Sequence, residues 1–399
     1  MLRKVKRSFL FWRGSLVASG VALIAATYGL VRLAFGLHLP AMSADLGVDT
    51  AAAGLVSAAG SIVYAVSALA GFLTAERHPR LLVVVATVTA GGGAIGIACA
   101  TGAASLALAA AVASAGAGLA SPALVRIIAR TFAERDASTP QAIVNAGTGP
   151  GLAIAGLIAL AFAADWRWCW AIAAGATLAA GIAVLATDRA GRAAPGDRSA
   201  ATPDAARLPP REWWAPHRHG VVASVLLGVG AAAIWNYGRV AMVDAGASDA
   251  ASATAWVLLG CGGAAVIATS RPLRRLQPRQ LWAIGASIIA VSTLALGTAP
   301  SHPVIAAGAC TLFGWAYVAA SGALIGWTTQ IDPSYAAAGT ALLFVAFMVG
   351  QAAGAAALGA LLPLGGPAVG FAAAAVVSLA AGASLTPPSR DRGAVEPVS

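Results

Sequence analysis

The chain has 399 residues, of which 59% are hydrophobic and only 10% are charged. Soluble domains carry about 25% charged residues, so this composition excludes a water-soluble globule, and a mean hydropathy of +0.80 excludes a disordered chain. Twelve membrane spans of about 20 residues would need about 240 apolar positions, which is close to what this composition supplies.

Six apolar runs precede a polar stretch and six follow it. The first six are Gly14–Leu39, Ala53–Ala75, Leu81–Ala100, Ser105–Ile128, Gln141–Ala163 and Trp168–Thr187. The second six are Gly220–Val243, Ala253–Ser270, Leu281–Ala299, Val304–Trp327, Ala336–Leu362 and Pro367–Leu385. Each run is long enough to cross the bilayer as a helix, and helices satisfy their own backbone polar groups there. The sequence therefore predicts an all-α integral membrane protein with twelve transmembrane helices.

The first run is preceded by basic residues, as in a secretory signal. A removable signal has a shorter apolar core and a small-residue cleavage site, whereas this run is long and contains Arg32. We therefore interpret it as the first span.

The Lys and Arg residues explain the net charge of +10. All but three lie in the N-terminal segment or in every second segment between runs, and the exceptions are Arg32, Arg167 and Arg239. Under the positive-inside rule this places both termini in the cytoplasm. The basic excess thus indicates a multi-pass protein of a bacterial inner (plasma) membrane, not a nucleic-acid surface.

The predicted domains follow from this layout. Residues 1–187 form an N-terminal six-helix bundle, 188–218 a flexible cytoplasmic linker, 219–386 a C-terminal six-helix bundle, and 387–399 a cytoplasmic tail. Trp213 and Trp214, at the end of the linker, are expected to anchor the seventh span at the membrane interface. The two halves repeat the same arrangement of runs and basic loops.

This layout resembles the major facilitator superfamily, and local residues add to the resemblance. The loop after the second span carries Gly71, Phe72, Leu73, Glu76, Arg77 and Arg80, which is similar to a degraded form of the family's loop motif. Asp165, Trp166, Arg167 and Trp168 resemble the Trp-Arg signature that opens the sixth span. The resemblance implies two pseudo-symmetric six-helix bundles around a central cavity, which opens to one side at a time.

Two charged residues lie within spans, Arg32 in the first and Arg239 in the seventh. A charge at this depth indicates a functional site by default, and a guanidinium offers a planar fork of donors suited to carboxylate or phosphate. We predict that both arginines bind an anionic substrate. The alternatives are that each snorkels to the headgroups, or that each pairs with groups of the protein such as Asp45 or Asp244.

The first span also resembles that of the organophosphate/phosphate antiporters, through Tyr28, Leu30, Val31, Arg32, Phe35, Leu37 and Pro40. In those antiporters the matching arginine binds the substrate phosphate. The fifth span departs from them, because it has Val144 before Asn145 where they place a substrate-binding histidine. The resemblance thus favours an anion without specifying phosphate.

Polar and aromatic residues within spans complete the predicted binding site, and the further candidates are Tyr28, Asn145, Asn236, Tyr237 and Tyr317. No carboxylate lies in the middle of a span, so exchange or charge-driven uniport fits better than proton coupling. His38 is expected to be an interfacial side chain, with proton relay as the alternative. The cysteines Cys99, Cys169, Cys261 and Cys310 lack metal-ligand spacing, and we expect neither a metal nor a cofactor.

The function predicted is a secondary active transporter, specifically an antiporter, that moves a small organic or inorganic anion across the inner membrane by alternating access. The alternative is efflux of drugs or neutral hydrophobic solutes, with Arg32 and Arg239 structural. A membrane-embedded enzyme is not expected, because no cluster of His, Cys or carboxylate lies at membrane depth. The expected partners are the substrate and the lipid bilayer, and we expect a monomer.

Overall fold

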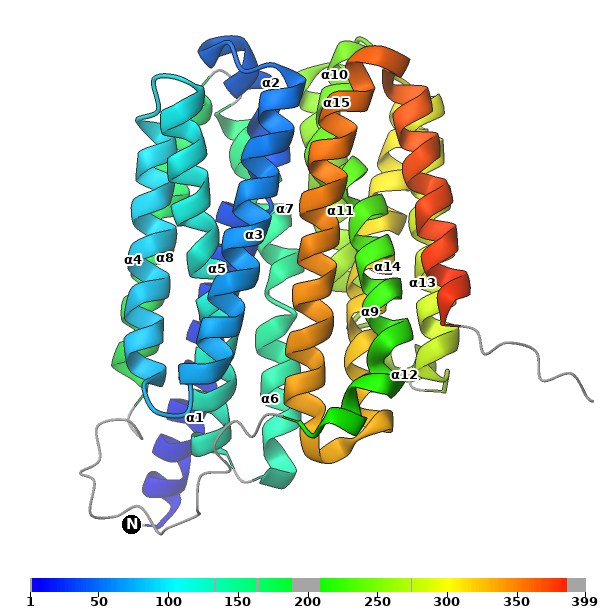
Figure 1. Cartoon of the computed structure of the whole chain (residues 1–399). Coiled ribbons are helices and arrows are strands. Elements are labelled where there is room, and N and C mark those ends of the chain that lie inside the picture. The colour runs from blue at the N-terminus through cyan, green and yellow to red at the C-terminus, as the bar shows by residue number, and fades with distance from the viewer. Residues whose placement is uncertain (1, 133, 163–164, 189–208, 274, 386–399) are drawn as a thin grey trace, which may run out of the picture.

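A computed structural model describes residues 2–132, 134–162, 165–188, 209–273 and 275–385. The N-terminal half is built from α1 (Leu2–Ile24), the π-helical segment η1 (Ala25–Arg32), α2 (Phe35–Leu46), α3 (Thr50–Thr74), α4 (Pro79–Ala98), α5 (Ala103–Thr131), α6 (Glu134–Asn145), α7 (Thr148–Ala161) and α8 (Trp166–Thr187). These helices lie together on one side of the molecule (Figure 1). The described parts of this half are thus helices joined by short turns.

The C-terminal half lies beside it. Its elements are α9 (Arg211–Ala232), the π-helical segment η4 (Ala233–Tyr237), α10 (Gly238–Asp244), α11 (Asp249–Ala265), α12 (Ser270–Leu273), α13 (Pro278–Thr298), α14 (Pro303–Ile331), the 3₁₀ turn η5 (Pro333–Tyr335) and α15 (Ala336–Ser384). The long α15 is two helices joined at Gly366, whose φ of 71° breaks the helical path. Figure 1 shows the chain rising in the first part and returning in the second.

Among the described residues, ten helical stretches are long and apolar enough to cross a membrane. One of them, Pro333–Ser384, contains both arms of α15. The predicted eighth span corresponds to α11, which has 17 residues and is not among the ten. The predicted all-helical membrane protein is therefore confirmed, whereas the count of twelve spans stays a prediction.

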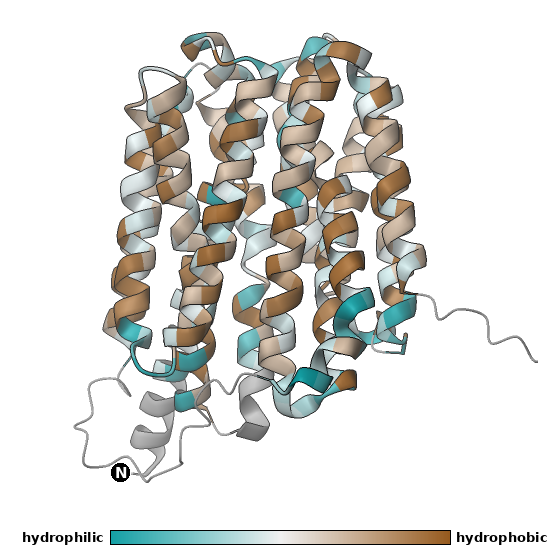
Figure 2. Ribbon diagram, in the orientation of Figure 1, coloured by the Kyte–Doolittle hydropathy of each residue, from teal (hydrophilic) through white to brown (hydrophobic). Residues whose placement is uncertain are grey.

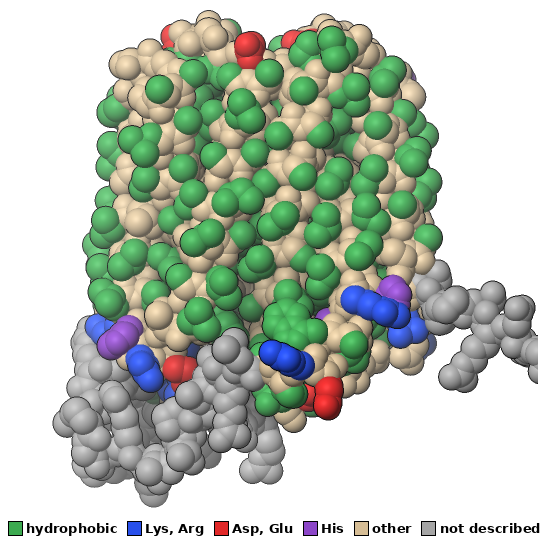
Figure 3. Space-filling view, in the orientation of Figure 1, with side chains coloured by type: hydrophobic (Ala, Val, Ile, Leu, Met, Phe, Trp, Pro, Cys, Tyr) green, Lys and Arg blue, Asp and Glu red, His purple; other side chains and the backbone are tan. Residues whose placement is uncertain are grey.

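The surface is apolar around the helices and polar at the two ends. Apolar residues cover the length of the helices, and hydrophilic ones gather mainly at the lower end, where α9 begins and the chain passes from α3 to α4 (Figure 2). Lys and Arg are visible at that end, whereas carboxylates are visible at both ends (Figure 3). We call this lower end the basic end, which carries Arg80, Arg126, Arg130, Arg211 and Arg279, and the opposite end the acidic end, which carries Asp45, Asp49, Asp165, Asp244 and Asp249.

Part of the predicted linker is helical. Residues from Arg211 onward belong to α9, so the segment 211–218 is the first turns of the seventh span and not a flexible connection. Trp213 is buried because its ring stacks on His217, with the centroids 3.8 Å apart, whereas Trp214 is exposed. His217 in turn bonds the hydroxyl of Thr328 in α14, at 2.9 Å. Residues 189–208 and the predicted tail lie outside the described residues.

The basic end of the N-terminal half is held by a buried carboxylate. Asp188, at the C-terminal end of α8, is fully buried and pairs with Arg80, at 3.0 Å, and with Arg130. Arg80 belongs to the loop motif recognised in the sequence, and it also donates to the carbonyl of Leu185. The neighbouring pair of Glu76 and Arg126 is about one-third exposed. The motif therefore connects α4 and α5 to the end of α8.

Small residues bring the two halves into direct contact. A Cβ at Gly149 of α7 would lie 2.6 Å from the backbone nitrogen of Ala264 in α11. A Cβ at Gly36 of α2 would lie 1.9 Å from the carbonyl oxygen of Trp235 in η4. Only glycine permits this spacing, as in other helix pairs that pack closely in membranes.

Candidate functional site

Each half has a π-helical segment next to its membrane arginine. Arg32 is the last residue of η1, and Arg239 lies two residues after η4. The amide of Leu33 donates to the carbonyl of Tyr28, five residues back, at 2.8 Å. Such wide turns are frequent at functional sites because they shift side chains out of ordinary helical register. The two predicted arginines thus occupy similar local structures in the two halves.

The Arg32 side chain lies between the two halves and has neutral partners. Its Nη2 donates to Sδ of Met348 at 2.7 Å and lies 3.4 Å from Oε1 of Gln351, both in α15. Its guanidinium carbon is 4.4 Å from the centre of the Tyr64 ring in α3, a cation–π contact. A thioether is a weak acceptor. Among the residues that the structure describes, no carboxylate forms an ion pair with Arg32.

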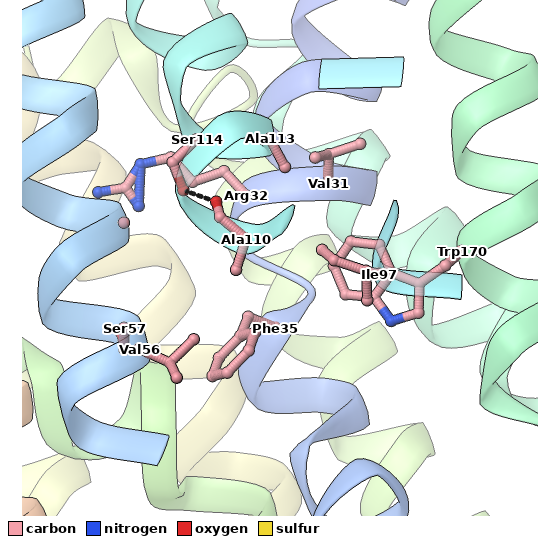
Figure 4. Close-up of a pocket in the computed structure, with 11 residues that line it drawn as sticks. Val31, Arg32, Phe35, Val56, Ser57, Ile97, Ala110, Ala113, Ser114 and Trp170 are labelled. Carbon is pink, nitrogen blue, oxygen red and sulfur yellow. Dashed lines mark hydrogen bonds between the residues drawn. The ribbon is translucent and has the colours of Figure 1, made fainter. Parts of the chain in front are cut away.

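A small cavity adjoins Arg32 on the side of the N-terminal half. It has a volume of about 30 Å³ and is bordered by Phe35, Ser57, Ser114 and Trp170 among others, so it has room for water but not for an organic substrate. Figure 4 shows the Arg32 guanidinium beside α3, with Ile97 and Trp170 on the opposite side. The arrangement around Arg32 is therefore closely packed in this conformation.

Aromatic residues from both halves lie around Arg32 and its partners. Tyr28 and Tyr64 share a hydrogen bond between their hydroxyls, 2.7 Å long, and their rings meet edge to face. On the other side Tyr317 of α14 packs edge to face against Trp235 and Phe347, with centroid distances of 5.0 and 5.6 Å. The predicted residues Tyr28, Arg32 and Tyr317 thus lie in one region.

Arg239 is in a different environment. It is 5% exposed, and each of its side-chain nitrogens has a protein partner. Nε donates to Ser252 at 3.1 Å, Nη2 pairs with Asp249 at 2.9 Å, and Nη1 donates to the carbonyl of Leu37 in α2. In this conformation Arg239 ties α10 to α11 and to the opposite half at the acidic end, and it does not share the environment of Arg32.

Of two further predicted residues, Asn236 bonds across the halves, whereas Tyr237 bonds within the C-terminal half. Asn236 accepts a hydrogen bond from Ser57 of α3 and donates to the carbonyl of Ala232. The Tyr237 hydroxyl donates to the carbonyl of Ala355 in α15, at 2.7 Å. Both side chains are buried. They lie at the junction of η4 with α3 and α15, beside and not within the cluster of aromatic residues around Arg32.

The remaining predicted residue, Asn145, is the exposed last residue of α6. No described contact links its side chain to Arg32. His38 differs from its expected interfacial position, because it is 5% exposed and packs against Trp170 at a centroid distance of 5.7 Å. The helix that contains it is covered at this point by α8.

Neither of the two carboxylates named as alternative partners of the membrane arginines pairs with one among the described residues. Asp45 pairs with Arg167, at 2.7 Å, and Arg239 pairs with Asp249 instead of Asp244. Met348 and the Leu37 carbonyl were not predicted as partners either, because nothing in the sequence marks a thioether or a main-chain oxygen as the neighbour of a distant arginine. Asp249 meets Arg239 because the turn after α10 reverses the chain.

In the described part of the chain no group of three or more His, Cys, Asp or Glu side chains could hold a metal ion. The cysteines are free; Cys169 and Cys310 are buried, and Cys99 and Cys261 are exposed. The chemistry available to the site is therefore charge pairing, hydrogen bonding and aromatic contact.

The family profile described as the Major Facilitator Superfamily matches residues 21–355. The chain belongs to this superfamily. It is a multi-pass membrane transporter, which agrees with the apolar helices. A search among curated proteins found no match for the sequence.

Several solved structures that are similar to this chain are of transporters. One is a mutant of the peptide transporter POT in complex with sulfate, with 15% identity and a TM-score of 0.73 over 93% of this chain and 92% of that one. A POT family transporter in complex with 5-aminolevulinic acid has 12% identity and a TM-score of 0.73, over 93% and 94%. The nucleoside transporter NupG has 14% identity and a TM-score of 0.71, over 94% and 100%. At these identities the likeness shows the fold alone.

Proposed function

We propose that this transporter is a secondary active carrier of a small anion, and that Arg32 is the residue that binds the negative charge. The observation that carries the proposal is the set of partners of Arg32: a thioether, an amide oxygen and an aromatic face. A guanidinium stays charged, and Arg32 is half-buried within a membrane span, where a charge without an opposite partner costs free energy. An anionic substrate would supply the missing partner.

Arg239 takes a second role in this proposal. Its bond to the Leu37 carbonyl joins the halves at the acidic end, and its ion pair with Asp249 anchors the guanidinium within the C-terminal half. Ser57 and Asn236 add a further bond between the halves nearby. We infer that these contacts form the closed gate of one state of an alternating carrier, and that Arg239 becomes available to the anion when they separate.

The distribution of Lys and Arg indicates which side of the membrane each end faces. If the basic end faces the cytoplasm of a bacterial inner membrane, as the positive-inside rule requires, the closed acidic end faces outward. Antiport of anions is the coupling we propose, because no Asp or Glu lies beside Arg32 in the part of the chain that the structure describes. The resemblance to the organophosphate antiporters agrees with an anion, and we propose a monomer as the working unit.

The test compares ligands on the purified chain. A thermal-shift series would use inorganic phosphate, succinate, benzoate and the lipophilic cation tetraphenylphosphonium, because a ligand that binds the folded state raises its apparent stability. We expect stabilisation by at least one anion, and loss of it in Arg32→Gln. Hydrogen bonds to charged groups contribute about 1.5–3 kcal/mol, so affinity should fall about 10- to 100-fold. The matched control is Arg279→Gln at the exposed basic end.

The second candidate function is efflux of neutral or hydrophobic solutes. The aromatic contacts of Trp235, Tyr317 and Phe347 favour it, because such rings bind apolar molecules. Arg32 would then hold Tyr64 and Met348 in place. In that case tetraphenylphosphonium or a neutral aromatic would stabilise the chain, Arg32→Gln would leave this effect unchanged, and the anions would have no effect.

A further inference from the structure

The aromatic residues beside Arg32 form two connected groups, one from each half. The first consists of Tyr28 and Tyr64, whose ring centroids are 5.8 Å apart. In the second, Tyr317 contacts Trp235, Phe313 and Phe347 at 5.0, 5.9 and 5.6 Å. Arg32 lies between the groups, because it covers the Tyr64 ring and reaches Gln351, which adjoins Tyr317. A ligand held by Arg32 would therefore have aromatic rings on two sides.

Two buried donors in this region are poorly satisfied. Gln351 and Trp235 are each 4% exposed; Nε2 of Gln351 has only a contact with the Tyr317 hydroxyl that falls short of normal hydrogen-bond geometry, and Nε1 of Trp235 makes no hydrogen bond among the described residues. A buried donor without a good acceptor costs free energy, so these two donors favour an acceptor-rich ligand. The amide of Gln351 belongs to the same side chain whose oxygen faces Arg32.

Among the described residues of this region, Arg32 supplies one positive charge that no carboxylate pairs with. Arg239 is already paired with Asp249. The other polar groups described around Arg32 include the hydroxyls of Tyr28, Tyr64 and Tyr317, the amide of Gln351, and Ser57 and Ser114 at the cavity, all of which are neutral. A ligand with one negative charge would be matched, whereas a dianion would keep a second charge without a partner at membrane depth.

We propose that the substrate is an aromatic monocarboxylate. This inference rests on the proposed function and specifies its substrate class. The carboxylate would accept from the fork of Arg32, which fits a planar carboxylate, and from Nε2 of Gln351. The ring would pack edge to face between Tyr64 and Tyr317, the geometry that aromatic rings prefer. Binding would require the two groups of rings to separate, because the cavity beside Arg32 is smaller than such a ligand.

Exposure of the side chains indicates where the ligand enters. Tyr28, Arg32 and Tyr317 are each partly exposed, although their neighbours along the helices are mostly buried. At the acidic end, the hydrogen bond from Arg239 to the Leu37 carbonyl holds the two halves together. We therefore expect access from the basic end in this conformation.

The decisive experiment measures ligand affinities of the unmodified chain in lipid nanodiscs by calorimetry. The ligands are benzoate, its saturated analogue cyclohexanecarboxylate, the neutral benzamide, the dianion phthalate and inorganic phosphate. We expect benzoate to bind about tenfold more tightly than cyclohexanecarboxylate, as one aromatic contact can provide. We expect benzamide, phthalate and phosphate to bind more weakly than benzoate.

Variants then show which residues make the chain bind benzoate more tightly than cyclohexanecarboxylate. Tyr317→Leu should bring benzoate and cyclohexanecarboxylate to similar affinities, whereas Tyr317→Phe, which keeps the ring, should preserve the difference. Tyr335→Leu, in η5 at the basic end, is the matched control. Gln351→Leu should weaken all carboxylates alike. If a variant fails to fold, the ligand series on the unmodified chain still decides the question.

The outcomes separate this inference from the function on which it rests. If phosphate, phthalate or cyclohexanecarboxylate binds as tightly as benzoate and Arg32→Gln abolishes that binding, the aromatic monocarboxylate is wrong and the anion carrier survives. If no anion binds in an Arg32-dependent way, both proposals fail. If benzamide binds as tightly as benzoate in both the original chain and Arg32→Gln, a neutral solute carrier replaces them.

Discussion

Nη1 of Arg239 donates a hydrogen bond to the main-chain carbonyl of Leu37, and this bond joins the seventh span to the first. The same guanidinium pairs with Asp249 at the start of α11. One side chain thus holds three helices from two halves at the acidic end. Because a carbonyl needs no particular side chain, the contact depends on the arginine and on how closely α2 approaches η4.

Removing the charge of Arg239 should open the acidic end more often. In Arg239→Gln the ion pair and the bond to Leu37 are lost, so the closed state loses about 1.5–3 kcal/mol. The measurement is thiol labelling of Leu37→Cys, a fully buried position, after the four native cysteines are replaced by alanine. We expect labelling by an impermeant reagent to become faster, and to stay slow with Arg279→Gln. Unchanged labelling would contradict the proposed gate.

Gly36→Ala tests the same gate by steric means. The added Cβ would lie 1.9 Å from the carbonyl oxygen of Trp235, so the halves must move apart, at a cost of about 1–3 kcal/mol for an overpacked contact. Gly175→Ala is the control, because its Cβ would meet nothing within 4 Å. We expect Gly36→Ala to speed labelling at Leu37→Cys without loss of expression. A variant that labels like the control would show that α2 and η4 do not limit closure.

Asp188→Asn should destabilise the N-terminal half. The carboxylate is fully buried and pairs with Arg80 and Arg130, so its neutral replacement leaves their charges poorly compensated and costs about 1–3 kcal/mol. The control is Glu76→Gln, whose ion pair with Arg126 is about one-third exposed and should contribute less than about 1 kcal/mol. Thermal unfolding in detergent measures the difference. Equal melting temperatures for the two variants would refute a structural role for Asp188.

A reporter fused after Ser399 tests the orientation. With an even number of spans and a cytoplasmic N-terminus, the fusion should be active as a cytoplasmic reporter and silent as a periplasmic one. A second fusion in the turn at Gly102, between α4 and α5, should give the opposite result. A periplasmic signal at Ser399 would overturn both the even count and the assignment of the basic end to the cytoplasm.

The membrane helices and the family can be predicted from the sequence, since long apolar runs and basic loops are local properties. Tyr28, Arg32 and Tyr317 were also predicted, and the structure brings them into one region. The start of α9 was not predicted, because the polar residues from Arg211 to His219 precede the apolar run of that helix. Asp45 and Asp244, the alternative partners of the membrane arginines, do not pair with them among the described residues.

A helical membrane protein with two arginines inside its spans follows from the order of the amino acids, because apolar runs and the charges within them are visible in the sequence. The difference between these arginines comes from the fold. Arg239 meets a carboxylate and a carbonyl brought from other helices, while Arg32 meets a thioether, an amide and a ring. The state of a buried charge depends on its neighbours in space, and helices distant in sequence supply those neighbours.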